Sequence, residues 1–447
     1  MDLLEQIRSA GVVGCGGAGF PAHVKLAARG VDTLIVNAAE CEPLLRTDRF
    51  LTLRKAGEIV AAIAAVKERL GVARAVVALK ESYVKEIQAL RSAIAEAPIE
   101  LHLMKSFYPA GDEQVMTFEV TGRVVPPAGL PLDMGCVVSN IATMHAIYNA
   151  MHGKSFTQKY LTISGAVKEP CMVKAPVGTS FADCLVLAGG ADLNDYIIVS
   201  GGPMMGKLYT REESSLLHAT KTASGFIVLP KHTKLAQLAN TPPRHMRNRA
   251  RAACIQCSFC TQLCPRWLLG HPLEPHKIMR KFAALPLESQ LEDPIIRTAR
   301  YCCECGVCEL AACPMQLNPR GVNREIKQML AARGERPMKG ELGLLPRQYR
   351  TERAIPTSRA AMCAGVHRWY QKEITRFIEA KPLRVSIALN SHIGVPAVPI
   401  VKEGERVSLG QCIAQPQEGK LGVPYHASID GVVESIGEQI VVAGEGA

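Results

Sequence analysis

The sequence predicts a multi-domain α/β protein, and three observations lead to that prediction. The chain has 447 residues, which exceeds what one hydrophobic core usually supports. Helical and strand patterns alternate from the start of the chain to about Gly153, as in an α/β layer. Two dense groups of cysteines then occupy a segment of their own, which indicates a further domain organised around metal.

The first domain is expected to span residues 1–158. Apolar Ile59, Ile63 and Val66 recur at helical spacing, and residues 84–95 carry a second helical pattern. Residues 75–79 and 99–104 are short apolar runs that are typical of buried strands. This alternation predicts a sheet with helices packed on it.

The rest of the chain divides where its composition changes. Residues 159–209 hold short β segments that end in glycine turns, and a linker is expected over 210–246. The cysteine-rich domain should span 247–334, and a second linker 335–381. Residues 382–447 form a small β domain in which segments 401–411 and 428–433 resemble the two halves of biotinyl and lipoyl carrier domains. Because no lysine lies at the tip between two hydrophobic residues, we expect packing or docking rather than covalent attachment of a cofactor.

Composition excludes several classes of protein. The chain is 48% hydrophobic and 21% charged, as in ordinary globular proteins. Its longest apolar runs, such as 59–66, are far shorter than the ~18 to 20 residues of a membrane-spanning helix, and Asp2 and Glu5 do not suit a signal peptide. We therefore expect a cytoplasmic protein without a membrane span. The formal charge is +11, but aromatic residues make up only 5% and are not interleaved with the basic ones, so no nucleic-acid partner is expected.

The spacing of the cysteines is the most specific signal in the chain. The first group is Cys254-x2-Cys257-x2-Cys260-x3-Cys264-Pro265, the spacing of bacterial ferredoxins, and the second is Cys302-x2-Cys305-x2-Cys308-x4-Cys313-Pro314. In that arrangement the fourth cysteine of each group crosses to the other cluster. One [4Fe–4S] cluster is then expected on Cys254, Cys257, Cys260 and Cys313, and the other on Cys302, Cys305, Cys308 and Cys264.

Zinc is the alternative occupant, since four thiolates also form a structural zinc site. Zinc sites pair two Cys-x2-Cys units and do not need triplets followed by Cys-Pro, so the spacing favours iron–sulfur clusters. Cys303 is left without an iron, although the sequence does not settle whether Cys302 or Cys303 is the ligand. The helical stretch 276–284 between the groups predicts an α-helical ferredoxin domain, and the basic stretch 244–251 is expected to offset the negative charge of the clusters.

A glycine-rich loop, VGCGGAGFP over residues 13–21, lies close to the start of the chain. Gly14, Gly16 and Gly19 match a dinucleotide-binding expression, but the preceding segment is helical, whereas that fingerprint follows a strand. The loop opens into a predicted helix over 21–29, so backbone N–H groups freed by glycine could face an anion. An ordinary turn is the simpler interpretation of the loop alone.

Polar residues follow three predicted strands, at the edge where open α/β sheets bind ligands. Each group taken alone is typical of a solvated loop or helix cap. The residues are Asn37, Glu40 and Glu42 after the first strand, Tyr108, Gly111, Asp112 and Glu113 after another, and Asn140 after a third.

Taken together, GCGGAGFP with Lys25, NAAECEP and YPAGDE resemble the flavin-binding subunit of respiratory complex I and the C subunit of Rnf complexes. The resemblance covers nearly the whole chain and includes a soluble-ligand-binding β-grasp (SLBB) domain, a dicluster ferredoxin domain and a barrel-sandwich domain. It implies an FMN site with NADH stacked on the flavin. The implied cofactor-binding residues are Gly14, Gly16, Gly17, Gly19, Phe20, Lys25, Asn37, Glu40, Glu42, Tyr108, Gly111, Asp112, Glu113 and Asn140.

The order of the parts narrows the resemblance. Segment 392–399 comes first in Rnf C subunits and last here, and this order resembles the cobalamin reductases of propanediol-utilisation microcompartments. That family implies a corrinoid substrate, a location inside a bacterial microcompartment, and an adenosyltransferase and a shell protein as partners. Two positions depart from relatives, because Ala142 replaces a frequent glutamate and Cys15 stands where complex I has arginine.

The expected chemistry converts one two-electron transfer into two one-electron transfers. NADH gives two electrons as hydride, a [4Fe–4S] cluster accepts one, and a flavin can exchange either number. No side chain is expected to act as a catalyst. Two rival interpretations remain open: an electron-entry module of a larger redox complex with a protein acceptor, and a non-catalytic scaffold stabilised by metal.

Overall fold

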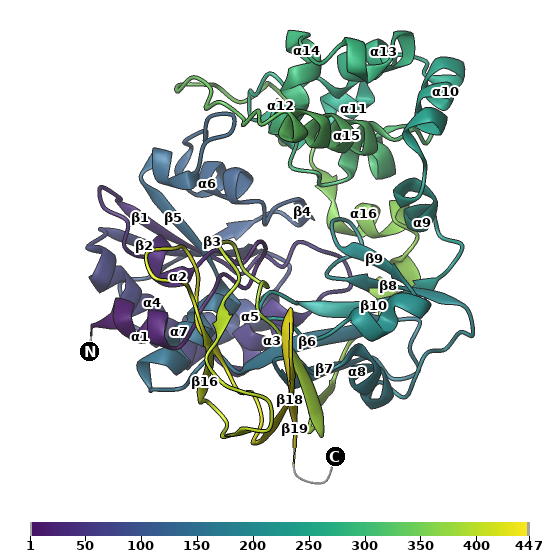
Figure 1. The fold of residues 1–447 in the computed structure, drawn as a ribbon. Helices are drawn as coiled ribbons and strands as arrows, with labels where there is room; N and C mark the ends of the chain where they lie inside the picture. The colour runs from purple at the N-terminus through teal and green to yellow at the C-terminus, as the bar shows by residue number, and fades with distance from the viewer. Residues whose placement is uncertain (1, 445–447) are drawn as a thin grey trace.

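The computed structural model describes residues 2–444 and begins with a parallel sheet. Its strand order is β3-β2-β1-β5, with β1 over Thr33–Asn37, β2 over Arg74–Lys80, β3 over Glu100–Met104 and β5 over Cys136–Asn140. Leu34, Ile35 and Val36 of β1 are fully buried, because helices cover both faces of a parallel sheet. The predicted α/β layer is confirmed (Figure 1).

The helices of this domain follow the expected patterns. Ile59, Ile63 and Val66 form the buried face of α4, which ends where Gly71 adopts a left-handed conformation. The expected helix over 21–29 is shorter in the structure, where only Ala22–Lys25 is helical. The helices are α1 (Leu3–Ser9), α2 (Ala22–Lys25), α3 (Thr47–Arg54), α4 (Ala56–Leu70), α5 (Val84–Ile94), α6 (Glu113–Thr121) and α7 (Ile141–Met151).

A second, six-stranded sheet has the order β12-β7-β6-β10-β8-β9. Its strands are β6 (Gln158–Gly165), β7 (Cys171–Pro176), β8 (Tyr196–Ser200), β9 (Lys207–Thr210), β10 (Gly225–Pro230) and β12 (Arg376–Glu379), and α8 (Phe181–Leu187) packs beside them. Strand β10 lies between β6 and β8, and β12 adds an edge beside β7. Residues 225–230 and 376–379 were expected in linkers, but the first segment is a buried strand of this sheet and the second pairs with β7 as an exposed edge strand.

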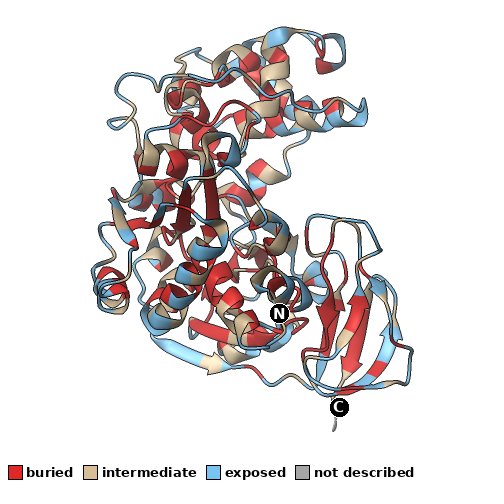
Figure 2. Cartoon of the chain, turned by 90° about the vertical axis from the view of Figure 1, so that its left-hand side faces the viewer, coloured by how far each residue is buried: buried red, intermediate tan, exposed pale blue. Residues whose placement is uncertain are grey.

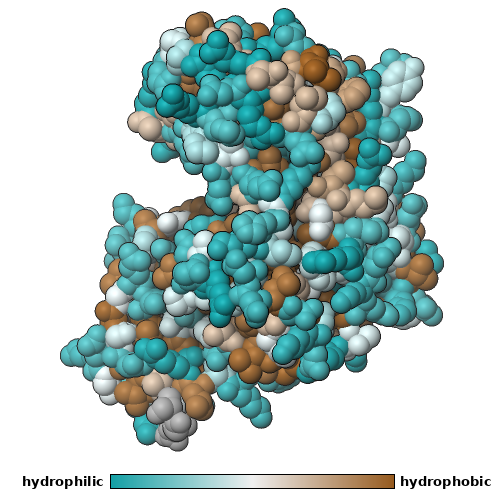
Figure 3. Space-filling view, turned by 90° about the vertical axis from the view of Figure 1, so that its right-hand side faces the viewer, coloured by the Kyte–Doolittle hydropathy of each residue, from teal (hydrophilic) through white to brown (hydrophobic). Residues whose placement is uncertain are grey.

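The cysteine-rich segment is helical and forms a lobe of its own, set off by a deep indentation on one side (Figure 3). Helix α13 covers Pro275–Ala284, close to the expected 276–284. The α-helical type of ferredoxin domain is therefore the one observed. The other helices are α9 (Lys234–Ala239), α10 (Pro243–Ala253), α11 (Phe259–Gln262), α12 (Pro265–Leu268), α14 (Pro294–Arg297) and α15 (Pro319–Ala332), with a π-helical turn over Cys308–Ala312.

The chain then returns to the first domain before it ends in a barrel. Strand β11 (Ile355–Pro356) pairs with β4 (Phe107–Tyr108), and α16 (Thr357–Cys363) and α17 (His367–Tyr370) follow. The barrel has two sheets, β13-β19-β18-β15 and β14-β16-β17. Its strands are β13 (Arg384–Ala388), β14 (Val398–Pro399), β15 (Arg406–Val407), β16 (Cys412–Gln415), β17 (Tyr425–His426), β18 (Gly431–Ile436) and β19 (Gln439–Ala443).

The barrel shares one hydrophobic core with the first domain. Buried barrel residues such as Val423 and Tyr425 belong to the same cluster as Val12 and Val13 near the N-terminus. Figure 2 shows buried residues continuing through the inner strands of the barrel. Within residues 2–444, none of the helices is both long and apolar enough to span a bilayer.

Candidate functional site

The glycine-rich loop is a closed turn whose tip is open. Val13 and Pro21 form a β-bridge, and the Gly14 N–H donates to the Phe20 carbonyl at 2.9 Å. Gly16 and Gly17 at the tip are exposed, and a Cβ added at Gly17 would meet no atom within 4 Å. The loop therefore offers backbone groups that a ligand can approach closely.

Lys25 connects this loop to the carboxyl edge of the sheet. Its Nζ donates to the Val138 carbonyl at 2.9 Å and to Glu113 Oε1 at 3.2 Å. Both side chains remain partly exposed, so this ion pair is weak and an incoming anion can compete for the lysine. The structure brings together Lys25 and Glu113, which lie far apart in the sequence.

The two asparagines lie at the ends of neighbouring strands, as the sequence indicated. Asn37 Nδ2 donates to the Gly111 carbonyl at 2.9 Å. Asn140 caps α7 by accepting from the Ala142 N–H at 2.8 Å, and its Nδ2 donates to Asp48 at 2.8 Å. A Cβ added at Gly16 would lie 2.8 Å from Asn140 Cβ, which places the glycine loop directly beside the end of β5.

Glu40 and Glu42, expected to contact a flavin, have other contacts in the structure. Glu40 Oε2 accepts from the backbone N–H groups of Asp48 and Arg49 at the start of α3, and burial raises its pKa to about 8. Glu42 Oε2 accepts from the Met204 N–H at 2.8 Å, and burial raises its pKa to about 7. Local spacing could not reveal the partner of Glu42, because Met204 lies 162 residues away, between strands β8 and β9.

Asp112 joins the strand-end site to the helical domain. Its side chain caps α6 and forms two contacts, of 2.7 and 2.8 Å, with the guanidinium of Arg266. Burial alone would raise the pKa of Asp112, but the charge of Arg266 holds it below its usual range. Arg266 follows Cys264-Pro265 directly, and the sequence analysis did not single it out.

Tyr108 makes a second connection to the same domain. The side chain is 2% exposed, and its hydroxyl donates to the Cys305 carbonyl at 2.8 Å. The same hydroxyl lies 3.5 Å from Glu42 Oε1. The strand-end site and the backbone of the second cysteine group are thus in direct contact.

The eight predicted ligand cysteines and Cys303 line two separate cavities. Cys254, Cys257, Cys260 and Cys313 line one, here called the outer cavity, together with Ile255 and Met315. The inner cavity is lined by Cys264, Cys302, Cys303, Cys305 and Cys308, together with Arg320. Cys313 thus lines the cavity of the first cysteine group and Cys264 that of the second, while the two ligand sets stay a prediction. Cys302 and Cys303 both line the inner cavity, so the choice between them stays open.

Both cavities are compatible with iron–sulfur clusters. A cubane takes each thiolate on a different iron, so its ligands lie apart around the cluster, and the cysteines lie around each cavity. Burial raises the pKa of Cys260 to about 12 and that of Cys264 still further, so these thiolates would be charged only when a metal cation is bound.

Basic groups surround the inner cavity. Arg320 forms a 2.6 Å ion pair with buried Glu309, and Lys327 Nζ donates to the Cys302 carbonyl at 3.2 Å. From the basic stretch before the first cysteine group, Arg249 donates to the Gln316 carbonyl at 2.9 Å, three residues after Cys313. Positive charge at both cavities suits anionic clusters.

The barrel contacts the glycine loop, which the sequence did not indicate. The Ile393 N–H donates to the Gly19 carbonyl at 3.1 Å, and a Cβ at Gly19 would lie 3.1 Å from His392 Cα. Buried Lys221 donates to the carbonyls of Gly11 and Pro424, at 2.7 and 2.8 Å. The barrel, which was expected to serve in packing or docking, thus packs against the glycine loop.

Four family models match successive parts of the chain. The Nuo51 FMN-binding domain matches residues 7–149, and the SLBB domain matches 160–208. The 4Fe-4S dicluster domain matches 253–318, and the RnfC barrel sandwich hybrid domain matches 361–447. The chain therefore has an FMN-binding domain and a dicluster domain, in agreement with the predicted fold class.

Similar proteins and structures were also found. The C subunit of the proton-translocating ferredoxin:NAD(+) oxidoreductase complex of Clostridium ljungdahlii is 35% identical over 60% of this chain and 56% of its own length. The NAD+-reducing [NiFe]-hydrogenase in the H2-reduced state aligns with a TM-score of 0.47 and 22% identity, covering 75% of this chain and 63% of the other.

Two relatives match the chain from end to end. Cobalamin reductase PduS of Salmonella typhimurium is 41% identical over 100% of this chain and 97% of its own length. The protein of the same name from Citrobacter freundii is 40% identical over 98% of this chain and 95% of its own length. With this identity over its whole length, the chain belongs to the PduS cobalamin reductase family.

Proposed function

We propose that this protein is an NADH-dependent cobalamin reductase, which passes electrons through FMN and two [4Fe–4S] clusters to a corrinoid. The relatives' name supports the corrinoid as the substrate, and the FMN-binding and dicluster domains support an electron-transfer oxidoreductase. When bound, the flavin accepts a hydride and releases single electrons to iron–sulfur clusters. The number of clusters and NADH as the donor are parts of the proposal.

One observation carries the proposed route: the Tyr108 hydroxyl donates to the Cys305 carbonyl at 2.8 Å. Tyr108 belongs to the same strand-end segment as Gly111, which accepts from Asn37. The buried Asp112–Arg266 pair fixes the two domains at the same place. This contact supports a route in which the inner cavity is the neighbour of the proposed flavin site.

The residues present fit the cofactors. The open tip at Gly17 and the amino group of Lys25 would hold the FMN phosphate, while Asn37 and Asn140 lie at the strand ends, where the rest of the flavin would bind. Four cysteines would hold each cluster, in the two sets that line the cavities. The outer cavity is lined by exposed Ile255 and Met315, so we assign it to the exit of electrons.

Two variants, Gly17→Ala and Lys25→Ala, test the proposed flavin site. A Cβ at Gly17 meets no atom, so Gly17→Ala should fold normally, yet its methyl group would block close approach of the phosphate. Lys25→Ala should remove a charge-assisted contact and lower flavin affinity about ten- to a hundredfold. Flavin and NADH-driven reduction should be lost together in both variants, while the iron–sulfur spectrum and its bleaching by dithionite remain.

Gly57→Ala is the matched control, because a Cβ at Gly57 also meets no atom within 4 Å but lies in α4. It should keep full flavin. A Gly17→Ala protein with wild-type flavin content and activity would show that the loop is only a turn.

The acceptor and location complete the proposal. A corrinoid acceptor predicts that the purified protein reduces cob(III)alamin with NADH and without another protein, whereas an electron-entry module of a larger complex requires a ferredoxin or other protein acceptor. Residence in a microcompartment, an adenosyltransferase and a shell protein as partners are supported by the sequence resemblance. Co-purification of either partner with the intact protein would test them.

A further inference from the structure

The structure contains a large polar cavity that the proposed electron route does not use. Its volume is about 870 Å³, and it lies between the first domain, the start of the β-grasp sheet and the barrel. The wall runs along α7 from Ala142 to His152, and Leu409 and Gly410 of the barrel close one side. A cavity of this size matches those that bind cofactors and other small molecules.

The cavity lies behind the glycine loop. Cys15 is the loop residue that lines it, and the Cys15 N–H donates to Thr143 Oγ1 at 2.9 Å. The residues proposed to hold FMN, such as Gly17, Lys25 and Asn37, are not part of its wall. The cavity is therefore separate from the proposed flavin site, although the two share the loop as a partition.

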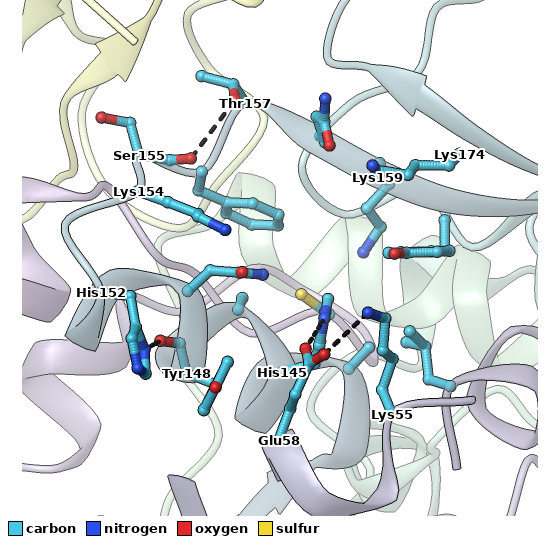
Figure 4. Close-up of a pocket in the computed structure, with 18 of the residues that line it drawn as sticks. Lys55, Glu58, His145, Tyr148, His152, Lys154, Ser155, Thr157, Lys159 and Lys174 are labelled. Carbon is cyan, nitrogen blue, oxygen red and sulfur yellow. Dashed lines mark hydrogen bonds and ion pairs between the residues drawn. The ribbon is translucent and has the colours of Figure 1, made fainter. Parts of the chain in front are cut away.

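Its wall carries an excess of positive charge. Lys55 and His145 both contact Glu58, at 2.8 and 3.1 Å (Figure 4). Lys174 Nζ lies 3.3 Å from Oε1 of Glu379, a residue outside the cavity wall. Burial lowers the pKa of His145 to about 4, so this ring is neutral at pH 7.

Two further lysines lack such carboxylate partners. The amino groups of Lys154 and Lys159 point into the cavity in Figure 4. The Lys159 residue is only 3% exposed, yet its amino group faces the cavity. Its ring contact is with Phe156, at 5.9 Å, and a longer-range attraction links it to buried Asp48. An ammonium that faces a cavity, without a carboxylate in close contact, is available to an anion that enters it.

The remaining lining suits a base and a sugar. Phe156 and Tyr160 offer aromatic surface, and Asn149, Gln158 and Thr157 offer donors and acceptors. We propose that this cavity binds a nucleotide, with its phosphate on Lys154 and Lys159. Both NADH and the nucleotide tail of a corrinoid carry a phosphate, a sugar and a base. The choice of these two candidate ligands rests on the proposed function, whereas the phosphate site is inferred from the lysines alone.

Calorimetric titration of the anaerobic holoprotein tests the proposal with four probes: ADP, NAD+, cobalamin, and cobinamide, which lacks the nucleotide. Lys159→Gln and Lys154→Gln should each weaken binding of the nucleotide-bearing probe about ten- to a hundredfold, with FMN content and the iron–sulfur spectrum unchanged. Lys154 is exposed, so its variant remains informative if Lys159→Gln does not fold. Lys168→Gln, an exposed lysine outside the cavity, is the control and should bind as the wild type does.

The outcomes separate the sources. If the lysine variants bind ADP and NAD+ more weakly but cobalamin with unchanged affinity, the cavity binds the dinucleotide. If they bind cobalamin more weakly but cobinamide with unchanged affinity, the cavity binds the nucleotide tail of the corrinoid. The proposal is wrong if the wild type binds none of the four probes or if both lysine variants bind them as the wild type does. It is also wrong if the variants lose FMN, because the lysines would then belong to the flavin site.

Discussion

The inner and outer cysteine cavities come from near-identical sequence motifs but lie in opposite surroundings. Cys305 and Cys308 of the inner cavity are buried, and the Cys305 carbonyl accepts from Tyr108 of the first domain. The outer cavity is lined by Ile255 and Met315, 62% and 39% exposed. Near-identical spacing therefore comes with different surroundings, and in the proposed route the group that contacts the first domain receives electrons and the exposed group releases them.

Removing one ligand from each cavity should have the largest effect on this comparison. Cys305→Ser should lower iron from about eight to about four atoms per chain and abolish NADH-driven reduction of the outer cluster, with FMN retained. Cys257→Ser should lose as much iron but still allow NADH to reduce the inner cluster. Iron and sulfide analysis with EPR of the NADH-reduced protein measures both.

Identical EPR spectra of the two NADH-reduced variants would contradict the proposal that electrons reach the inner cluster before the outer one. Wild-type protein purified without air with only about four iron atoms, or with stoichiometric zinc, would rule out the pair of clusters altogether.

Breaking the buried ion pair should have the next largest effect. Asp112→Asn keeps the cap on α6, since Asn also caps helices, but it leaves the Arg266 guanidinium buried without its carboxylate. Such a loss costs about 3 to 5 kcal/mol of unfolding free energy. Denaturant unfolding, followed through the loss of cluster absorbance, should shift to lower denaturant concentration.

Asp112→Asn combined with Arg266→Met is the control for that variant, because it removes the unpaired charge and should recover part of the stability. If the single variant unfolds like the wild type, the pair does not hold the inner cavity to the first domain.

Tyr108→Phe should have a smaller effect. It removes one hydrogen bond to the Cys305 carbonyl, a loss of about 0.5 to 1.5 kcal/mol, and leaves every thiolate in place. We expect full iron and flavin content and a rate of cluster reduction by NADH that falls less than tenfold in stopped-flow measurements. An unchanged rate would mean that the contact does not lie on the electron route.

Cys303→Ser should have the smallest effect, because the motif assigns it no iron. Cys303 and Cys302 both line the inner cavity, so metal analysis of each serine variant decides between them. Loss of one cluster in Cys303→Ser but not in Cys302→Ser would exchange their roles.

Local patterns predicted most of the fold and the cysteine sets. The strands over residues 75–79 and 99–104 depend on neighbours in the sequence, so the sequence displays them. The grouping of Cys264 and Cys313 with distant cysteines came instead from the known spacing of bacterial ferredoxins, and the cavity linings agree with it. Strands β10 and β12 could not be assigned to the second sheet in this way, because their partners lie tens to hundreds of residues away. Glu40 shows the same limit, since an acidic residue after a strand suits a ligand site and a helix cap equally well.

The contact between the barrel and the glycine loop bears on how this architecture can be rearranged. The last domain of the chain shares its core with the first, and Ile393 donates to Gly19 across that boundary. A domain docked this way can be encoded at either end of a gene and still reach the same place, much as in a circular permutation. The sequence resemblance places the equivalent segment first in Rnf C subunits, so the two gene orders are compatible with one assembled shape around the loop.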